Sequence, residues 1–359
     1  MMIRILLALV TLSLPLAAAQ PNILLIVTDD QGYGDFSING NEHLQTPNID
    51  KLGRESVRFD RFYVNSFCAP TRAALMTGRW PLRTGCHGVT HNREAMRPSE
   101  VTMAEALQAG GYRTACIGKW HNGEQYPFTP PGQGFDVFFG FHNGHWNNYF
   151  DPVLLRGTQH EQTKGYISDV LTNEAMKFIV ASKQQPFLCY LAYNAPHSPY
   201  QVPDKYFDKF KAKGFEDSVA AFYGMCENLD DNVGRLLAQL DELGIADNTI
   251  VLFLTDNGGT AGVKIYNAGM RGGKTSVHEG GTRVPLQPDC TSSALPPTCV
   301  ATMGSPVAIA SRMVFELPSA SEGSTNRSMA RSSCATSSRA PGSQVRWATP
   351  ACCSRSRQA

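Results

Sequence analysis

The chain has 359 residues, of which 42% are hydrophobic, and a formal net charge of +1. This length allows two domains, or one large α/β domain with additions, and enough apolar residues for a sizeable core. Proteins that bind nucleic acid or an anionic membrane usually carry a clear excess of basic residues, which this chain lacks. Its net charge therefore gives no reason to expect such partners, and any anion site must be local.

The first 19 residues have the pattern of a secretory signal peptide. Arg4 precedes an apolar segment at 5–16, and the small residues at 17–19 follow it. Pro15 interrupts a segment that is already shorter than the about 20 apolar residues of a membrane-spanning helix. We therefore expect cleavage near Ala19, export to the periplasm or the extracellular space, and no membrane span after the signal is removed.

Four short apolar runs are typical of buried parallel strands. They are NILLIV from Asn22, TACIG from Thr114, PFLCYLAY from Pro186 and TIVLFL from Thr249. Segments 168–183 and 217–244 lie between these runs and have apolar residues at helical spacing. This alternation predicts an α/β fold, a doubly wound and mostly parallel sheet with helices on both faces.

Polar side chains follow each of the four runs directly. In chain order they are Asp29 and Asp30, Lys119 and His121, His197, and Asp256 and Asn257. Because ligands of open α/β sheets bind beyond the carboxyl ends of the strands, we expect these side chains to meet at one edge. Adjacent carboxylates repel each other unless a cation or proton lies between them, and hard oxygen ligands suit Ca²⁺ or Mg²⁺. The alternative is that each acidic pair caps a helix.

The stretch NSFCAPTRAALMTGRW places Cys68 at the head of another apolar run. Pro70 suits the first position of a helix through TRAALMTG, which puts Cys68 at or just before the helix N-terminus, where free N–H groups favour an anion. Arg72 adds a bidentate donor for the oxygens of such an anion. Taken alone, a cysteine before a helix is more often structural than catalytic.

The segment Cys68-Ala69-Pro70-Thr71-Arg72 resembles the sulfatase signature, whose cysteine is oxidised to formylglycine by a maturation enzyme. The resemblance continues in family order over about residues 21–286. It includes PNILLIVTDDQGYGD, TACIGKWH, AYNAPHSPY, FLTDNGG and RGGKTSVHEGGTRVP. It implies the sulfatase core of the alkaline-phosphatase-like superfamily for residues 20–286.

The resemblance also implies a set of site residues. The implied calcium site, with Mg²⁺ as a second possibility, consists of Asp29, Asp30, Asp256, Asn257 and the formylglycine formed from Cys68. The implied sulfate contacts and catalytic groups are Arg72, Lys119, His197 and Lys274, with His121 beside the nucleophile. Hydrated formylglycine is a geminal diol: one hydroxyl attacks sulfur, and the other expels sulfate as the carbonyl reforms.

The stretch FFGFHNGHWNNYF, residues 138–150, is a candidate lining for a substrate cleft. His142, Asn143 and His145 are its candidates for contact with substrate or sulfate. Trp146 and Tyr149 are candidates for stacking on sugar rings. A packed loop without substrate contacts is the equal alternative.

Residues 287–359 differ in composition from the rest of the chain. They are rich in serine and have low complexity, with no sign of the smaller C-terminal subdomain that sulfatases normally have. We expect this tail to be disordered, and our hypothesis is that it is an out-of-frame or otherwise aberrant sequence.

The sequence predicts an exported, calcium-dependent sulfatase that acts on a sulfated small molecule or polysaccharide after a maturation enzyme has converted Cys68. Two alternatives remain open. One is a phosphonate or phosphate diester hydrolase on the same scaffold, and the other is a non-catalytic glycan-binding protein or inactive remnant. No nucleic-acid partner is expected.

Overall fold

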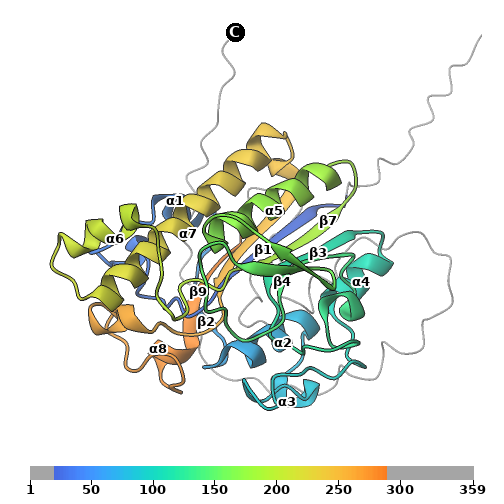
Figure 1. Cartoon of the computed structure of the whole chain (residues 1–359), viewed down its shortest axis with the longest axis horizontal. Helices are drawn as coiled ribbons and strands as arrows, with labels where there is room; N and C mark the ends of the chain where they lie inside the picture. Colours follow the sequence, from blue (N-terminus) through green and yellow to red (C-terminus); the bar gives the residue numbers. More distant parts are fainter. Residues whose placement is uncertain (1–19, 289–359) are drawn as a thin grey trace, which may run out of the picture.

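The computed structural model describes residues 20–288, which form a nine-stranded sheet with helices on both faces (Figure 1). The strand order is β2-β9-β8-β1-β7-β3-β4-β5-β6. The strands are β1 Asn22–Thr28, β2 Phe59–Tyr63, β3 Arg113–Lys119, β4 Val137–Phe141, β5 Val153–Arg156, β6 Gln159–Gln162, β7 Phe187–Ala192, β8 Thr249–Thr255 and β9 Arg283–Pro288. The predicted α/β class and the four predicted strands are confirmed.

The sheet is parallel in its middle and antiparallel at both edges. Strands β8, β1, β7, β3 and β4 are parallel to their neighbours within this group. Strands β9 and β2 at one edge, and β5 and β6 at the other, pair antiparallel. The middle strands are buried on both faces, which is why they read as continuous apolar runs in the sequence.

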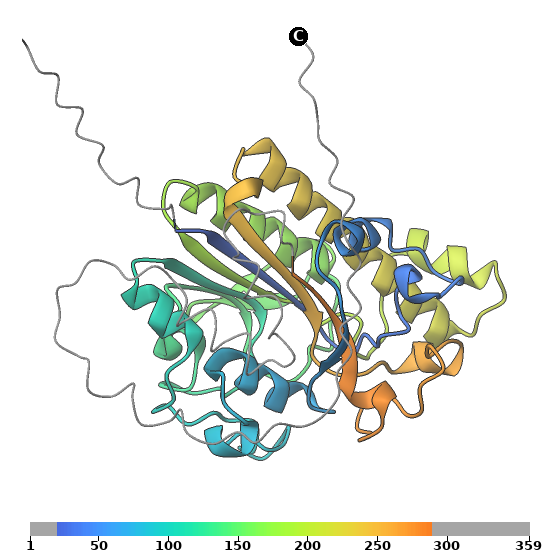
Figure 2. The ribbon, with the colours of Figure 1, turned by 180° about the vertical axis from the view of Figure 1, so that it is seen from behind.

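The helices form two layers that cover opposite faces of the sheet, as Figures 1 and 2 show. The described helices are α1 Pro47–Glu55, α2 Cys68–Thr77, α3 Pro81–Thr84, α4 Met103–Ala109, α5 Ile167–Ser182, α6 Asp204–Lys211, α7 Asp217–Glu242 and α8 Glu279–Thr282. Leu24 and Ile26 of β1 pack in one core with α1, α5 and α7, whereas Leu25 and Val27 pack with α2 and α4. Successive side chains of a strand point to opposite faces of the sheet, so β1 contacts both helical layers in alternation.

Helix α2 begins earlier than the sequence predicts. Its first residue is Cys68, its N-cap is Phe67, and Pro70 is the third residue of the helix rather than the first. The N–H groups of the first turn have no partner within a helix, so a proline at the third position costs no hydrogen bond. Cys68 therefore lies in the first turn.

Two expectations about the ends of the chain fall outside the described residues. These are the signal peptide at 1–19 and most of the tail, at 289–359. Strand β9 runs to Pro288, two residues past the expected domain boundary at 286. Within residues 20–288, every helix is too short or too polar to cross a membrane.

Candidate active site

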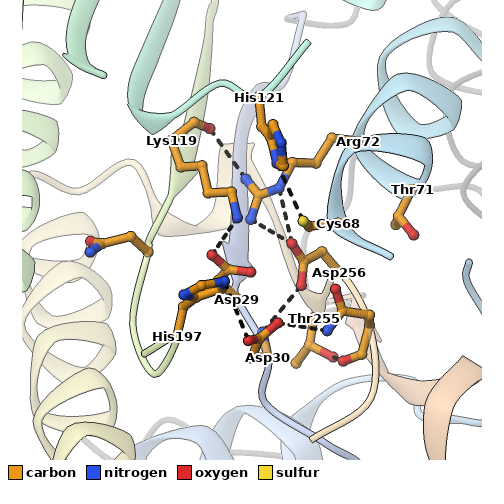
Figure 3. A network of polar contacts seen from close by, with 12 residues as sticks. Asp29, Asp30, Cys68, Thr71, Arg72, Lys119, His121, His197, Thr255 and Asp256 are labelled. Atoms are coloured by element: carbon orange, nitrogen blue, oxygen red, sulfur yellow. Dashed lines mark hydrogen bonds and ion pairs between the residues drawn. The ribbon is translucent and has the colours of Figure 1, made fainter. Parts of the chain in front are cut away.

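The pairs Asp29-Asp30 and Asp256-Asn257 lie side by side because they follow β1 and β8, which are neighbouring parallel strands. Their register pairs Thr28 with Thr255, so the residues that follow emerge together. The backbone N–H of Asp30 donates to Asp256 Oδ1 at 3.2 Å, and Asn257 Nδ2 donates to Asp30 Oδ1 at 2.8 Å. The predicted convergence of these pairs is confirmed (Figure 3).

Each of the three aspartates has a cationic partner. Lys119 Nζ lies 2.5 Å from Asp29 Oδ2. Lys274 Nζ lies 2.6 Å from Asp30 Oδ1. The third pair joins Arg72 to Asp256 and is described below. Because an unpaired buried charge is very costly, these pairs explain how three carboxylates can lie buried close together.

The Arg72 guanidinium is hydrogen-bonded to Asp256 and does not point toward solvent. Its Nε and Nη2 both donate to Asp256 Oδ2, at 3.0 and 2.8 Å, and its Nη1 donates to the Lys119 carbonyl and the Tyr190 hydroxyl. The Arg72 side chain is completely buried. Direct contact of Arg72 with sulfate thus stays a prediction, and the geometry gives this residue a positioning role on Asp256.

The charges of this cluster shift each other's pKa values. Burial raises the pKa of Asp256, and the charge of Asp29 adds to this, whereas the cations Arg72 and Lys119 lower it. Burial alone would lower the pKa of Lys274, but the charges of Asp30 and Asp29 hold it above its ordinary value. Lys274 is therefore cationic at neutral pH.

The oxygens in this cluster fit a hard divalent cation. Asp29 Oδ1 and Asn257 Oδ1 are buried without a hydrogen-bond partner among the described residues. Ligand atoms of Asp29, Cys68 and Asp256 lie within 4.8 Å of one another, as do those of Asp29, Asp30 and His197. Buried oxygens without donors are costly unless a cation accepts their lone pairs, and Ca²⁺ and Mg²⁺ prefer oxygen ligands.

His121 lies directly beside Cys68. The distance from its Nδ1 to the Cys68 Sγ is 3.3 Å, and its Nε2 lies 3.1 Å from the Val89 carbonyl oxygen. A carbonyl only accepts, so Nε2 carries the proton and the Nδ1 lone pair faces Cys68. Burial, and next the charge of Lys119, lowers the pKa of His121 well below its usual value, so the ring is neutral.

Burial also raises the pKa of the Cys68 thiol above its ordinary value. A thiol with a raised pKa stays protonated at neutral pH, and the thiolate is the nucleophilic form. The unmodified side chain is therefore a poor nucleophile in this position, even with a base beside it.

His197 lies beside Asp30 on the side away from Cys68 (Figure 3). Lys274 is paired with the same carboxylate. His197 Nε2 is 3.7 Å from Asp30 Oδ2, and its Nδ1 is bonded to the Ser198 carbonyl oxygen at 2.6 Å. The ring of His145 stacks on that of His197, with centroids 5.7 Å apart. Of the three candidates at 142–145, the structure thus brings His145 to the cluster.

The other candidates of that loop have different surroundings. The His142 ring stacks on Phe138 at 4.9 Å, and Asn143 is exposed and bonded to Glu124. Their contact with substrate stays a prediction. Tyr149 is fully buried and its hydroxyl donates to the carbonyl oxygens of Asn194 and His197, so the idea that it stacks on sugars is wrong.

Sequence reasoning missed two residues that support His121. One is Val89, whose carbonyl sets the tautomer of the ring. The other is Gly144: a Cβ there would lie 2.5 Å from His121 Nε2, so only glycine lets the loop pack on the imidazole. Neither residue carries a sequence signal, because backbone contacts between distant segments leave no local pattern.

The sequence pattern of the sulfatase family matches residues 21–286. N-acetylgalactosamine-6-sulfatase of Mus musculus is 34% identical over 318 residues, which are 79% of this chain and 60% of that protein. Arylsulfatase A of Homo sapiens is 34% identical over 315 residues, with 77% and 60% covered. The chain thus spans about 60% of the length of these curated relatives.

Solved structures give the same result for the fold. The crystal structure of Ps i-CgsB in complex with k-i-k-neocarrahexaose superimposes with a TM-score of 0.70 at 32% identity, over 80% of this chain and 68% of that one.

Proposed function

Because this chain belongs to the sulfatase family, we propose that it hydrolyses sulfate esters, R–O–SO₃⁻, to an alcohol and inorganic sulfate. The observation that carries the proposal is the 3.3 Å contact between His121 Nδ1 and the side chain of Cys68, directly beside the paired charges at the strand ends. A base, a modifiable side chain and a charged cluster that fits a divalent cation lie in one place, which is an arrangement suited to sulfuryl transfer.

We propose that a maturation enzyme converts Cys68 to formylglycine. Two features support this. The protonated thiol is a poor nucleophile, and a hard cation held by Asp29 and Asp256 prefers an oxygen to a thiol at the neighbouring position. A hydrated aldehyde supplies that oxygen, and its second hydroxyl gives a way to release sulfate.

The neutral His121 then has a defined task. Its Nδ1 lone pair faces residue 68, so it accepts a hydroxyl proton from the hydrated side chain while Val89 holds the Nε2–H. Once that proton has passed to water, the same nitrogen can take the proton of the second hydroxyl, whose loss expels sulfate as the carbonyl reforms. His121 therefore serves residue 68 rather than the leaving alcohol.

The residues that would hold a calcium ion are Asp29, Asp30, Asp256 and Asn257. When bound, the ion supplies positive charge to the sulfuryl oxygens and to the oxygen of residue 68. Lys119 and Lys274 neutralise Asp29 and Asp30 and keep ammonium groups beside the position of the sulfate.

His197 is the proposed acid for the leaving oxygen. Its Nδ1 is held by the Ser198 carbonyl, so Nε2 is the nitrogen that faces the cluster. His145 stacks on the same ring and contributes to the wall on the leaving-group side. In the doubly protonated ring, a proton given from Nε2 neutralises the alkoxide as the ester bond breaks.

A sulfated saccharide is the proposed substrate class, and the periplasm or extracellular space is the proposed place of action. The first point rests on relatives named for N-acetylgalactosamine-6-sulfatase activity and on a similar structure that holds k-i-k-neocarrahexaose. The second rests on the signal-like pattern of residues 1–19.

The test is hydrolysis of an aryl sulfate by the full chain, produced in a host with the maturation system. Mass spectrometry of the peptide with residue 68 should show CHO in place of CH₂SH, and chelation of divalent cations should remove the activity. Cys68→Ala is the matched inactive control. Faster hydrolysis of an aryl phosphate diester, or full activity of the alanine variant, would overturn the proposal.

A further inference from the structure

A concave surface lies between α6, the first turns of α7 and the loop that follows β7. It is a groove of about 380 Å³, within the size range of ligand pockets, about 300–1,000 Å³. Its lining residues are Phe150, Tyr200, Gln201, Val202, Phe207, Asp217, Ser218 and Ala221. Three aromatic rings thus share one small depression with a carboxylate, an amide and a hydroxyl.

The groove is connected to the candidate active site through one loop. Tyr200 follows His197 by three residues, and the Gln201 side chain holds the Asn147 carbonyl and the Tyr149 backbone N–H. Tyr149 in turn bonds the His197 carbonyl. The groove wall and the proposed acid are therefore parts of one hydrogen-bonded unit.

The charges of the active site also affect the pKa of the Tyr200 hydroxyl. Its pKa is raised, first by burial and then by the charge of Asp30, with Lys274 opposing. Lys274 is one of the two lysines proposed to lie beside the sulfate, and Asp30 is one of the proposed ligands of the calcium ion. Because three residues of chain span at most about 11 Å, Tyr200 lies close enough to His197 for a sugar ring that continues from the sulfated residue to reach it.

The charges of the groove do not suit a second sulfated ring. None of the eight lining residues is Lys or Arg, and the acidic Asp217 has a side chain that is 80% exposed and ion-paired to Lys211 at 2.6 Å. The accessible rings are those of Phe150, Tyr200 and Phe207. Such rings pack against the apolar C–H face of a sugar, while amide and hydroxyl groups bond its hydroxyls.

We propose that this groove is a subsite for an uncharged hexose that is linked to the sulfated residue being hydrolysed. This inference rests on the proposed function and adds to it. The enzyme acts on an oligosaccharide and recognises the uncharged sugar that is linked to the sulfated one. Phe207 supplies stacking area in the groove, and a sulfate on the neighbouring ring would find no cation among the lining residues.

The test measures binding in the Cys68→Ala background, so that it does not depend on activity. Two probes are compared: a sulfated monosaccharide, and a disaccharide in which the same residue carries a neutral hexose. The disaccharide should bind about tenfold more tightly, which corresponds to about 1.4 kcal/mol. Phe207→Leu, which keeps apolar volume but removes the ring, should abolish this preference and leave monosaccharide affinity unchanged.

Trp80→Ala is the control, because Trp80 is a 65% exposed aromatic residue outside the groove, and it should change neither affinity. Equal affinity for the two probes, or equal losses for both in Phe207→Leu, would overturn the subsite. A disaccharide with a sulfated neighbour that binds as well as the neutral one would overturn its charge preference. If aryl sulfate hydrolysis by the wild type succeeds while the binding preference is absent, only the subsite fails.

Discussion

The middles and the carboxyl ends of the central strands are equally buried but hold opposite kinds of side chain. Cys116 and Cys189 lie within β3 and β7, surrounded by apolar neighbours, and burial raises the pKa of both thiols. Cys68 is buried to a similar degree, yet it lies beside His121 and the charged cluster. Burial therefore does not separate a structural cysteine from a functional one, whereas the neighbouring groups do.

The largest expected effect on activity comes from replacing a cysteine by alanine, beside the strand ends in one variant and within a strand in the other. Cys68→Ala should reduce kcat/KM for an aryl sulfate by at least about 10³-fold, because the nucleophile is removed. Cys189→Ala should leave kcat/KM within about twofold and cost about 1 kcal/mol of unfolding free energy from lost packing. Kinetics and urea denaturation of both variants measure the contrast, and similar activity losses in the two would contradict it.

The second prediction concerns the buried pair at the strand ends. Arg72→Met leaves Asp256 as an uncompensated buried carboxylate, so it should lower the free energy of unfolding by about 3–5 kcal/mol. The control is Lys177→Ala, because its 3.5 Å pair with Glu174 is formed by a 73% exposed lysine and should contribute less than about 1 kcal/mol. Equal stability of the two variants would show that Asp256 is not charged in the folded protein.

The third prediction tests Lys274, one of the two lysines proposed to lie beside the sulfate. Lys274→Met should lower kcat/KM for an aryl sulfate by about 10²-fold, since removal of one preorganised charge typically has this cost. Lys264→Met, a change in a nearby lysine with no role in the cluster, should have little effect. A drop in both variants would point to a general effect of net charge on substrate association.

The smallest effect is expected from a buried acid outside the cluster. Burial raises the pKa of Asp35 to about 7 from an ordinary 3.8, although its Oδ2 accepts the Gly32 N–H at 2.7 Å. The folded state then binds a proton that the unfolded state releases, so stability is highest at low pH and falls as the pH rises through about 7.

Relative to Asp35→Asn, the wild type should therefore lose about 2 kcal/mol of unfolding free energy between pH 5 and pH 7.5. Thermal or urea unfolding of both proteins at several pH values measures this difference. If the unfolding free energies of the two proteins change with pH in the same way, burial does not raise the pKa of Asp35.

Much of the fold followed from local patterns in the sequence. The runs that begin at Asn22, Thr114, Pro186 and Thr249 are strands because residues buried on both faces leave an uninterrupted apolar signature. Strand β2 and the edge strands β5 and β6 escaped prediction, because they are short and partly exposed and carry no such signature.

By itself, the sequence determined the four strands β1, β3, β7 and β8, the polar residues at their ends and the position of Cys68 at the start of a helix. Only the tertiary structure decided which charges pair. Lys119 meets Asp29, Arg72 meets Asp256 and Lys274 meets Asp30 across 90, 184 and 244 positions of the chain. Secondary structure depends on neighbours in sequence, whereas these pairs depend on the order of strands in the sheet, which no local pattern records.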